Sequence, residues 1–195
     1  IFALESGGEQ HVILTAVGQD AYMWRGKVIE ADTLLEAGRP IVVYDSLSVR
    51  EGVTLSMAAG VQLYFHDGAN LWVHGRIVAE GTVDRPVVFR GDRTDRMFDY
   101  LPYDNTPSRW GGIRLKATST DNRLNHVDIH SASYGIACDS SSTDVMKLTL
   151  ENSVIHNVGG EGLGLYHCRA SVGNTQISNT LGHCVAVVGG WAEFV

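Results

Sequence analysis

The chain has 195 residues, a net charge of −7, 44% hydrophobic and 19% charged residues, and 22 glycines. This composition excludes a disordered chain, which would be poor in apolar residues and densely charged. The glycines follow no three-residue period, and no apolar run approaches roughly 18 residues, so collagen and helical membrane proteins are excluded as well. The 15 basic residues form no stripe or cluster, so nucleic acid is not an expected partner.

The first 45 residues contain two runs that read as strands, at positions 11–17 and 21–24. Residues 30–37 are the best helical candidate in the chain. They are few and are followed by Gly38, so we expect a turn or a single helical turn there. From residue 46 to 90, short runs with period-two alternation are separated by Gly, Asn, Asp and Ser, a pattern that predicts a series of strands.

An internal repeat is present in the second half of the chain. Residues 152–157 align with residues 174–179, and Ile129, Ile155 and Ile177 lie 26 and 22 positions apart (155 − 129 and 177 − 155). Two more sets follow the same offsets: Ile136, Leu163 and Val185, and Cys138, Leu165 and Val187. Repeats of this length made only of strands predict a solenoid in which each strand pairs in parallel with its copy one turn later.

The predicted fold is therefore an all-β, single-stranded parallel β-helix over residues 46–195. Aliphatic side chains should stack inside it, and Asn157 and Asn179 should form a hydrogen-bonded ladder. Two antiparallel sheets are the alternative, but Greek-key sandwiches do not repeat at a fixed offset. An open parallel edge recruits other chains, so we expect residues 1–45 to be an N-terminal β cap. Residues 191–195 read as the middle of a strand, which predicts a solenoid truncated at its C-terminal end.

Three segments resemble the coils of right-handed parallel β-helix proteins: residues 49–65, residues 71–89, and Trp110-Gly111-Gly112-Ile113. Over positions 41–195, including the stretch 89–104, the chain is similar to the pectin-lyase-like, β-helix-repeat surface lipoproteins of Bacteroidota. The resemblance implies a right-handed helix and display on the outer membrane or outside the cell. It also implies that membrane attachment is only through a lipid anchor, which these residues do not include. Such coil motifs specify a fold well and an activity poorly.

The long connection from Gly91 to Arg109 is the main irregular feature. It is either a flap that contacts a ligand, a calcium ion or a partner, or an Ω-like loop that packs its aromatic residues on the solenoid wall. Its candidate binding residues are Asp92, Asp95, Asp99, Tyr100, Tyr103, Asp104 and Trp110.

A second candidate site is the outward column formed by His130 and His156 beside Asp128, which Ser178 continues. Neighbouring coils are about 5 Å apart, so these side chains could hold a metal ion or act as an acid–base pair. A stacked polar surface column is the other interpretation. The three cysteines have no Cys-x-x-Cys spacing, and Cys168 and Cys184 should lie about 20 Å apart, so we predict three free thiols.

The catalytic signatures of β-helix glycan-cleaving enzymes are absent: there is no Asp-Asp, no Gly-His-Gly and no Trp-Ile-Asp-His. We therefore expect a scaffold without catalysis or cofactor that binds a glycan or another outer-membrane protein. Exposed aromatic residues would carry the binding, with Trp72, Trp110, Tyr166 and Trp191 as candidates. The alternatives are a polysaccharide lyase or glycoside hydrolase whose site lies mostly beyond residue 195, and an adhesin that acts through residues 91–109.

Overall fold

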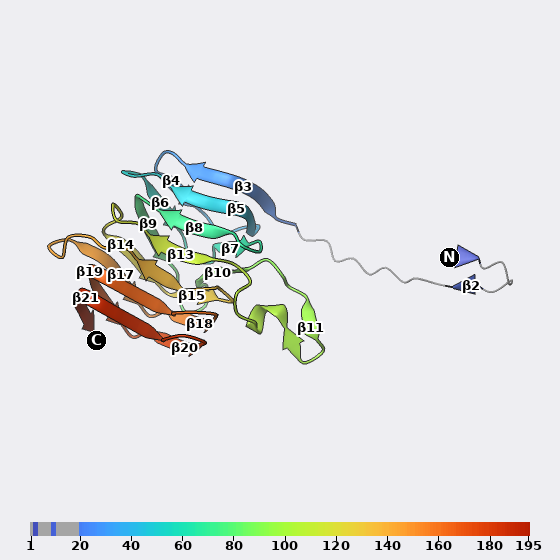
Figure 1. The fold of residues 1–195 in the computed structure, drawn as a ribbon. Coiled ribbons are helices and arrows are strands. Elements are labelled where there is room, and N and C mark those ends of the chain that lie inside the picture. Colours follow the sequence, from blue (N-terminus) through green and yellow to red (C-terminus); the bar gives the residue numbers. More distant parts are fainter. Residues whose placement is uncertain (1, 4–8, 11–19) are drawn as a thin grey trace.

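The computed structural model describes residues 2–3, 9–10 and 20–195 (Figure 1). The strand predicted at positions 11–17 therefore lies outside the described residues. Strands β1 (Phe2–Ala3) and β2 (Glu9–Gln10) form a small antiparallel pair. From Tyr22 onward, 17 strands form one continuous parallel sheet that winds into a β-helix, which confirms the predicted solenoid. Within the described part of the chain, no helix has the length and apolar character needed to cross a membrane.

The strands stack into three walls, which we call A, B and C. Wall A consists of the first halves of β3 (Tyr22–Ile29) and β5 (Ile41–Val49), then β7 (Gln62–Phe65), β10 (Val87–Gly91), β15 (Val127–His130), β18 (Val154–Val158) and β20 (Gln176–Thr180). Wall B consists of the second halves of β3 and β5, then β8 (Asn70–Val73), β13 (Gly112–Leu115), β16 (Ile136–Cys138), and the first halves of β19 (Leu163–Gly173) and β21 (Val185–Phe194). Wall C consists of β4 (Thr33–Leu35), β6 (Thr54–Met57), β9 (Arg76–Glu80), β14 (Asn122–Asn125), β17 (Met146–Glu151) and the second halves of β19 and β21.

Apolar side chains fill the interior in columns, because alternate residues of each strand point inward and parallel pairing keeps them in register. Ile129 pairs with Ile155, which pairs with Ile177, as predicted, and the first two are fully buried. The two other predicted columns are also present. The side-chain amide of Asn179 donates to Asn157 Oδ1, which confirms the predicted ladder.

A second ladder occupies the corner between walls C and A. Asn174 Nδ2 donates to Asn152 Oδ1 (2.7 Å), and Asn152 Nδ2 donates to Asn125 Oδ1 (2.9 Å). Asn152 and Asn174 have positive φ (50° and 43°), and His126 at the same corner has φ 48°. Asparagine tolerates this left-handed conformation better than most residues, which explains why it recurs where the chain turns sharply.

The predicted boundary between a cap and the coils is wrong. The first half of β3 pairs in parallel with β5, and β4 pairs in parallel with β6, so residues 22–45 belong to the solenoid itself. Val43 and Leu47 of β5 are fully buried and continue the internal columns. A turn or a single helical turn was expected at residues 30–37, but strand β4 occupies the middle of this segment. The segment is extended because it pairs with β6, which places Leu35 beside Met57 at the end of the core.

The connection that follows β10 is a folded insertion. It forms a hairpin of β11 (Arg96–Phe98) and β12 (Leu101–Pro102) followed by the 3₁₀ helix η1 (Tyr103–Asn105). In Figure 1 this insertion, drawn in green, projects from the corner of the solenoid where wall A meets wall B. We call residues 92–109 the hairpin insertion.

Candidate functional site

The densest group of ionisable side chains lies on the outer face of wall A. Strand alternation turns Asp128 and His130 of β15 outward, and register places His156 of β18 beside His130. His130 Nδ1 is 2.7 Å and His156 Nε2 is 3.2 Å from the same oxygen, Asp128 Oδ1. The two imidazole rings are stacked with centroids 4.8 Å apart. The structure thus brings together all three predicted metal or acid–base candidates.

The hairpin insertion contributes a fourth member to this group. Asp104 Oδ1, from η1, is 2.9 Å from His130 Nε2 and 2.9 Å from the guanidinium of Arg90 on β10. Both ring nitrogens of His130 therefore face carboxylates, one from its own strand and one from the insertion. We call the set Arg90, Asp104, Asp128, His130 and His156 the wall A network.

Burial and charge set the protonation of the wall A network. Burial alone lowers the pKa of His130, but hydrogen bonds to Asp104 and Asp128 outweigh it and raise this pKa to about 9. Burial opposes ionisation of Asp128, yet the hydrogen bonds from His130 and His156 hold its pKa well below the usual range. His130 is thus an imidazolium ion between two carboxylates at neutral pH, and each of these charges already has a partner.

The remaining acidic residues of the hairpin insertion do not converge. Asp92 bonds to His66 (2.7 Å), which lies just after β7, and Asp95 pairs with Arg93 (2.7 Å). The backbone carbonyl of Asp99 accepts a hydrogen bond from Arg96. The carboxylates of Asp92 and Asp95 face different partners, and no three acidic residues within the described residues 92–109 form a group of potential metal ligands, so the insertion does not assemble the oxygen cluster that calcium requires.

The aromatic residues of this region divide into two kinds. Tyr100 is 81% exposed and stacks on Phe98, and Tyr103 lies beneath the guanidinium of Arg93, 3.7 Å from the ring centroid. Trp110 is only 1% exposed and stacks on Phe65, with ring centroids 4.3 Å apart. The expectation that Trp110 is exposed is therefore wrong, because its indole fills the core and its Nε1 donates to the carbonyl of His130 (2.8 Å).

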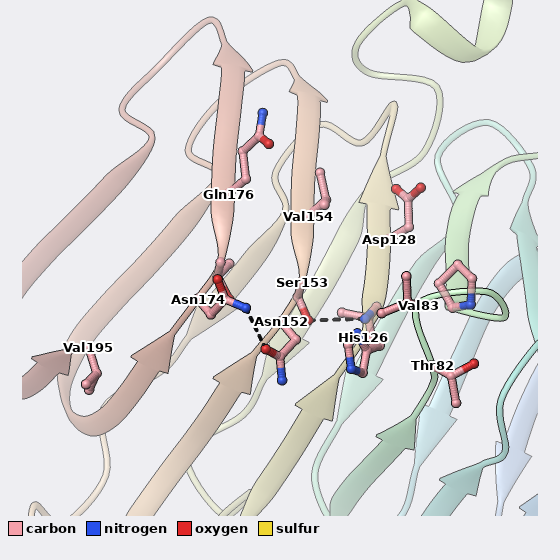
Figure 2. Close-up of a pocket in the computed structure, with 13 residues that line it drawn as sticks. Thr82, Val83, His126, Asp128, Asn152, Ser153, Val154, Asn174, Gln176 and Val195 are labelled. Carbon is pink, nitrogen blue, oxygen red and sulfur yellow. Dashed lines mark hydrogen bonds between the residues drawn. The ribbon is translucent and has the colours of Figure 1, made fainter.

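A polar groove of about 680 Å³ runs along the corner between walls C and A (Figure 2). Thr82 and Val83, from the connection between β9 and β10, form one end, and Asn152 and Asn174 line its length. Asp128, Val154 and Gln176 project from neighbouring strands along its edge. The asparagine side chains in this groove already hydrogen-bond to one another, so much of its polar surface is satisfied internally.

A second groove, of about 520 Å³, lies on wall B and differs in character. It is lined by Arg114, Tyr134, Ala137, Gly160, Glu161, Tyr166, Gly182 and His183, and we call it the tyrosine groove. The floor of the groove lies close to the backbone because one outward column of the wall contains only small residues: Ala137, Gly164 and Ala186. The hydroxyl of Tyr166 donates to Glu161, which raises the pKa of Tyr166, and the hydroxyl of Tyr134 donates to Asn70 Oδ1 (3.0 Å).

Glycines allow both tyrosine rings to lie against the wall. A Cβ on Gly112 would be 2.7 and 2.8 Å from the Cδ2 and Cε2 atoms of Tyr134, and a Cβ on Gly164 would be 2.9 Å from Cε2 of Tyr166. Both tyrosines are half-buried. The rings therefore rest on bare backbone and keep accessible area for a ligand. Sequence reasoning listed Tyr166 but missed Tyr134, since nothing in the sequence shows which glycine lies beside it one coil away.

Wall B continues beyond the tyrosine groove toward the N-terminal coils. Trp72 pairs in register with Arg114, and the ammonium of Lys116 lies 5.4 Å from the Trp72 ring centroid. Asp139 accepts from Arg114 (2.8 Å) and pairs with Lys116 (3.3 Å). Trp72 is half-buried, and Trp191, the last of the four candidate aromatics, is 44% exposed on the final coil.

All three cysteines are free, as predicted. Cys138 and Cys168 are buried and Cys184 is exposed. Cys138 and Cys168 are neighbours inside the core, which the sequence reasoning did not foresee. The interaction between their thiol groups lowers the pKa of Cys168 to about 7 and, together with burial, raises the pKa of Cys138.

A comparison of the chain with protein-family models, curated proteins and solved structures found no match. The class that the structure defines is a parallel β-helix protein with two outward-facing sites, the wall A network and the tyrosine groove.

Proposed function

We propose that this chain is a β-helix module that binds an oligosaccharide in the tyrosine groove without cleaving it. One observation carries the proposal: two tyrosine rings lie on the floor of a groove of about 520 Å³, with Arg114, Glu161 and His183 around them. The volume is within the range of roughly 300–1,000 Å³ that small-ligand sites occupy.

The chemistry of the groove suits a sugar better than an apolar ligand. Aromatic rings offer flat apolar faces against which the C–H face of a pyranose can pack. The hydroxyl groups of Tyr134 and Tyr166 already donate to Asn70 and Glu161, but their oxygen atoms can still accept hydrogen bonds from sugar hydroxyl groups. Arg114 supplies several N–H donors and Glu161 supplies carboxylate acceptors, the two kinds of partner that sugar hydroxyl groups require. A purely apolar ligand would leave these groups unpaired at a cost in affinity.

The arrangement of wall B also suits a chain of sugars. Coils repeat about every 4.8 Å along the solenoid axis. Trp72, Tyr134 and Tyr166 come from different coils of the same wall, so an extended glycan would cross several of them. Repeat proteins commonly bind in this way, because adjacent coils combine into a long surface.

The test is isothermal titration calorimetry of the full chain with neutral gluco- and manno-oligosaccharides and with an oligogalacturonide. Tyr134→Ala and Tyr166→Ala should each weaken binding of whichever sugar binds by at least about tenfold, as loss of an aromatic anchor does. Tyr100→Ala, which truncates an 81% exposed tyrosine of the hairpin insertion, is the matched control and should bind as the wild type does.

Two results would reject the groove as the glycan site. One is unchanged affinity in both groove variants, and the other is loss of binding in Tyr100→Ala alone, which would favour the adhesin alternative. Circular dichroism of each variant establishes that the solenoid is intact.

Glycan cleavage is a second candidate, and one observation favours it. The wall A network joins carboxylates and imidazoles from different coils on one wall, as a catalytic β-helix would. Against it, each charged group there is already paired within the network. An assay for new reducing ends, with the same oligosaccharides incubated with the protein, distinguishes binding from cleavage. If the wild type produces new reducing ends and His130→Gln does not, the protein is an enzyme.

We also propose that the module is displayed on the cell surface through a lipid anchor, where it binds a glycan or an outer-membrane protein. The resemblance of its coils to those of surface lipoproteins supports this placement. Protease treatment of intact cells that express the complete gene tests it, since a surface-displayed β-helix would be removed while periplasmic markers survive.

A further inference from the structure

We propose that Asp128, His130 and His156 form a zinc site on wall A, oriented by Asp104 from the hairpin insertion. The site lies on a different wall from the tyrosine groove and does not depend on glycan binding. One possible ligand atom from each of the three residues lies within 4.8 Å of the other two. Within residues 20–195 this is the one such group of histidine, cysteine and acidic side chains.

Two of the three separations between the donor atoms are close to what a zinc ion requires, and the third is at most 4.8 Å. Zn²⁺ bonds to imidazole nitrogen at about 2.0–2.1 Å, which places tetrahedral ligand atoms about 3.3 Å apart. Asp128 Oδ1 is 2.7 Å from His130 Nδ1 and 3.2 Å from His156 Nε2. The two rings are stacked, so binding requires His156 to turn its lone pair toward the ion, and its 28% exposed side chain leaves room for this rotation.

The second ring nitrogen of His130 supports the same assignment. In metal sites, a ligating histidine usually donates its other ring N–H to a carboxylate, which fixes the orientation of the ring. If Nδ1 of His130 binds the ion, Nε2 donates to Asp104 Oδ1 at 2.9 Å, and Arg90 holds Asp104 from the other side at 2.9 Å. Asp104 is therefore a positioning residue and not a ligand.

The donor set selects the class of ion. Two imidazoles and one carboxylate suit zinc and similar divalent transition ions, whereas Ca²⁺ and Mg²⁺ prefer oxygen donors alone. Three protein ligands leave a fourth position, and Asp128 and His156 are about one-third exposed, so water completes the coordination. An ion bound there would link β15 to β18 and, through Asp104, attach the insertion to the wall.

The test is titration of the full chain with ZnCl₂ by calorimetry, together with thermal melts and the visible spectrum of the Co²⁺ form. We expect one ion per chain, a Tm that rises with free zinc, and the absorption bands of tetrahedral Co²⁺. His156→Ala and Asp128→Asn should abolish the Co²⁺ bands. Asp104→Ala should weaken zinc binding by about 10- to 100-fold, as loss of an orienting carboxylate does.

Matched controls separate this site from adventitious binding. Asp95→Ala removes a carboxylate from the same insertion that pairs only with Arg93, and His183→Ala removes an exposed histidine on wall B, so both should leave zinc affinity unchanged. The proposal is overturned if the wild type shows no stoichiometric zinc binding, or if Asp128→Asn and Asp104→Ala bind zinc as tightly as the wild type does. In either case the network would be a purely structural ion-pair chain.

Discussion

Raising the pH should destabilise the solenoid through His130. Its side chain is only 8% exposed, and its two ring nitrogens face Asp104 and Asp128. Burial lowers the pKa of His130, but the hydrogen bonds raise it from 6.5 to about 9 overall. Since the folded chain holds the proton more tightly than the unfolded chain, this stabilisation is complete below pH 6.5 and is lost as the pH rises through 9.

The magnitude follows from the two pKa values. Each tenfold difference in proton affinity corresponds to about 1.4 kcal/mol, so the interval from 6.5 to about 9 contributes about 3 kcal/mol to the free energy of unfolding. The pKa of Asp128 is held low, so its contribution is present above 3.8 and is lost only in strong acid.

The assay is urea denaturation of the wild type and of His130→Gln at several values between about pH 6 and pH 10, with EDTA present to exclude metal ions. The wild type should lose about 3 kcal/mol across this range, while the variant should lose much less because it has no proton to release there. A histidine resonance that titrates near pH 9 in the wild type and is absent from the variant would assign the effect. Equal pH dependence in both proteins would refute the reasoning.

Three further predictions concern the coils. Ile155→Ala should lower the free energy of unfolding, measured by urea denaturation, by about 2–5 kcal/mol, because the side chain is fully buried. Ile177→Ala should lower it less, because Ile177 is only partly buried near the last coil, and equal losses in the two variants would contradict the column packing. Gly75→Ala should fail to fold or should have a much lower melting temperature than the wild type, because a Cβ there would be 2.2 Å from two backbone oxygens of the preceding coil. A melting curve like that of the wild type would contradict this geometry. In a thiol-reagent assay, Cys184 should react at once and the two buried thiols only after denaturation, so fast reaction of all three would show that the core is open.

The architecture was predictable because its signal is local and repeated. Ile129, Ile155 and Ile177 are spaced at the length of a coil, and a solenoid is the arrangement in which such spacing stacks identical positions. The asparagine pair at 157 and 179 was found by the same reasoning. The first coils were misjudged because β3 and β4 have little sequence likeness to the later coils, although they pair with β5 and β6 in the same way.

The sites were predictable only in part. Strand alternation and the repeat offset were enough to place Asp128, His130 and His156 in one outward cluster. The part played by Asp104 was not predictable, because the path of a long insertion decides which of its several aspartates reaches His130. Exposure of the aromatic residues was equally unpredictable: Trp72 lies in wall B strand β8 and Trp110 lies just before wall B strand β13, but only Trp110 lies in the core.

The sequence by itself determined the winding of the chain, since the alternation of side chains and the length of each coil are properties of neighbouring residues. Only the tertiary structure decided which side chains meet across coils and across the insertion. Tyr134 lies on Gly112, and Asp104 lies on His130, because backbone segments distant in sequence are brought within a few ångströms of each other. Such contacts depend on the three-dimensional path of the chain, and that path is set by the packing of the whole solenoid.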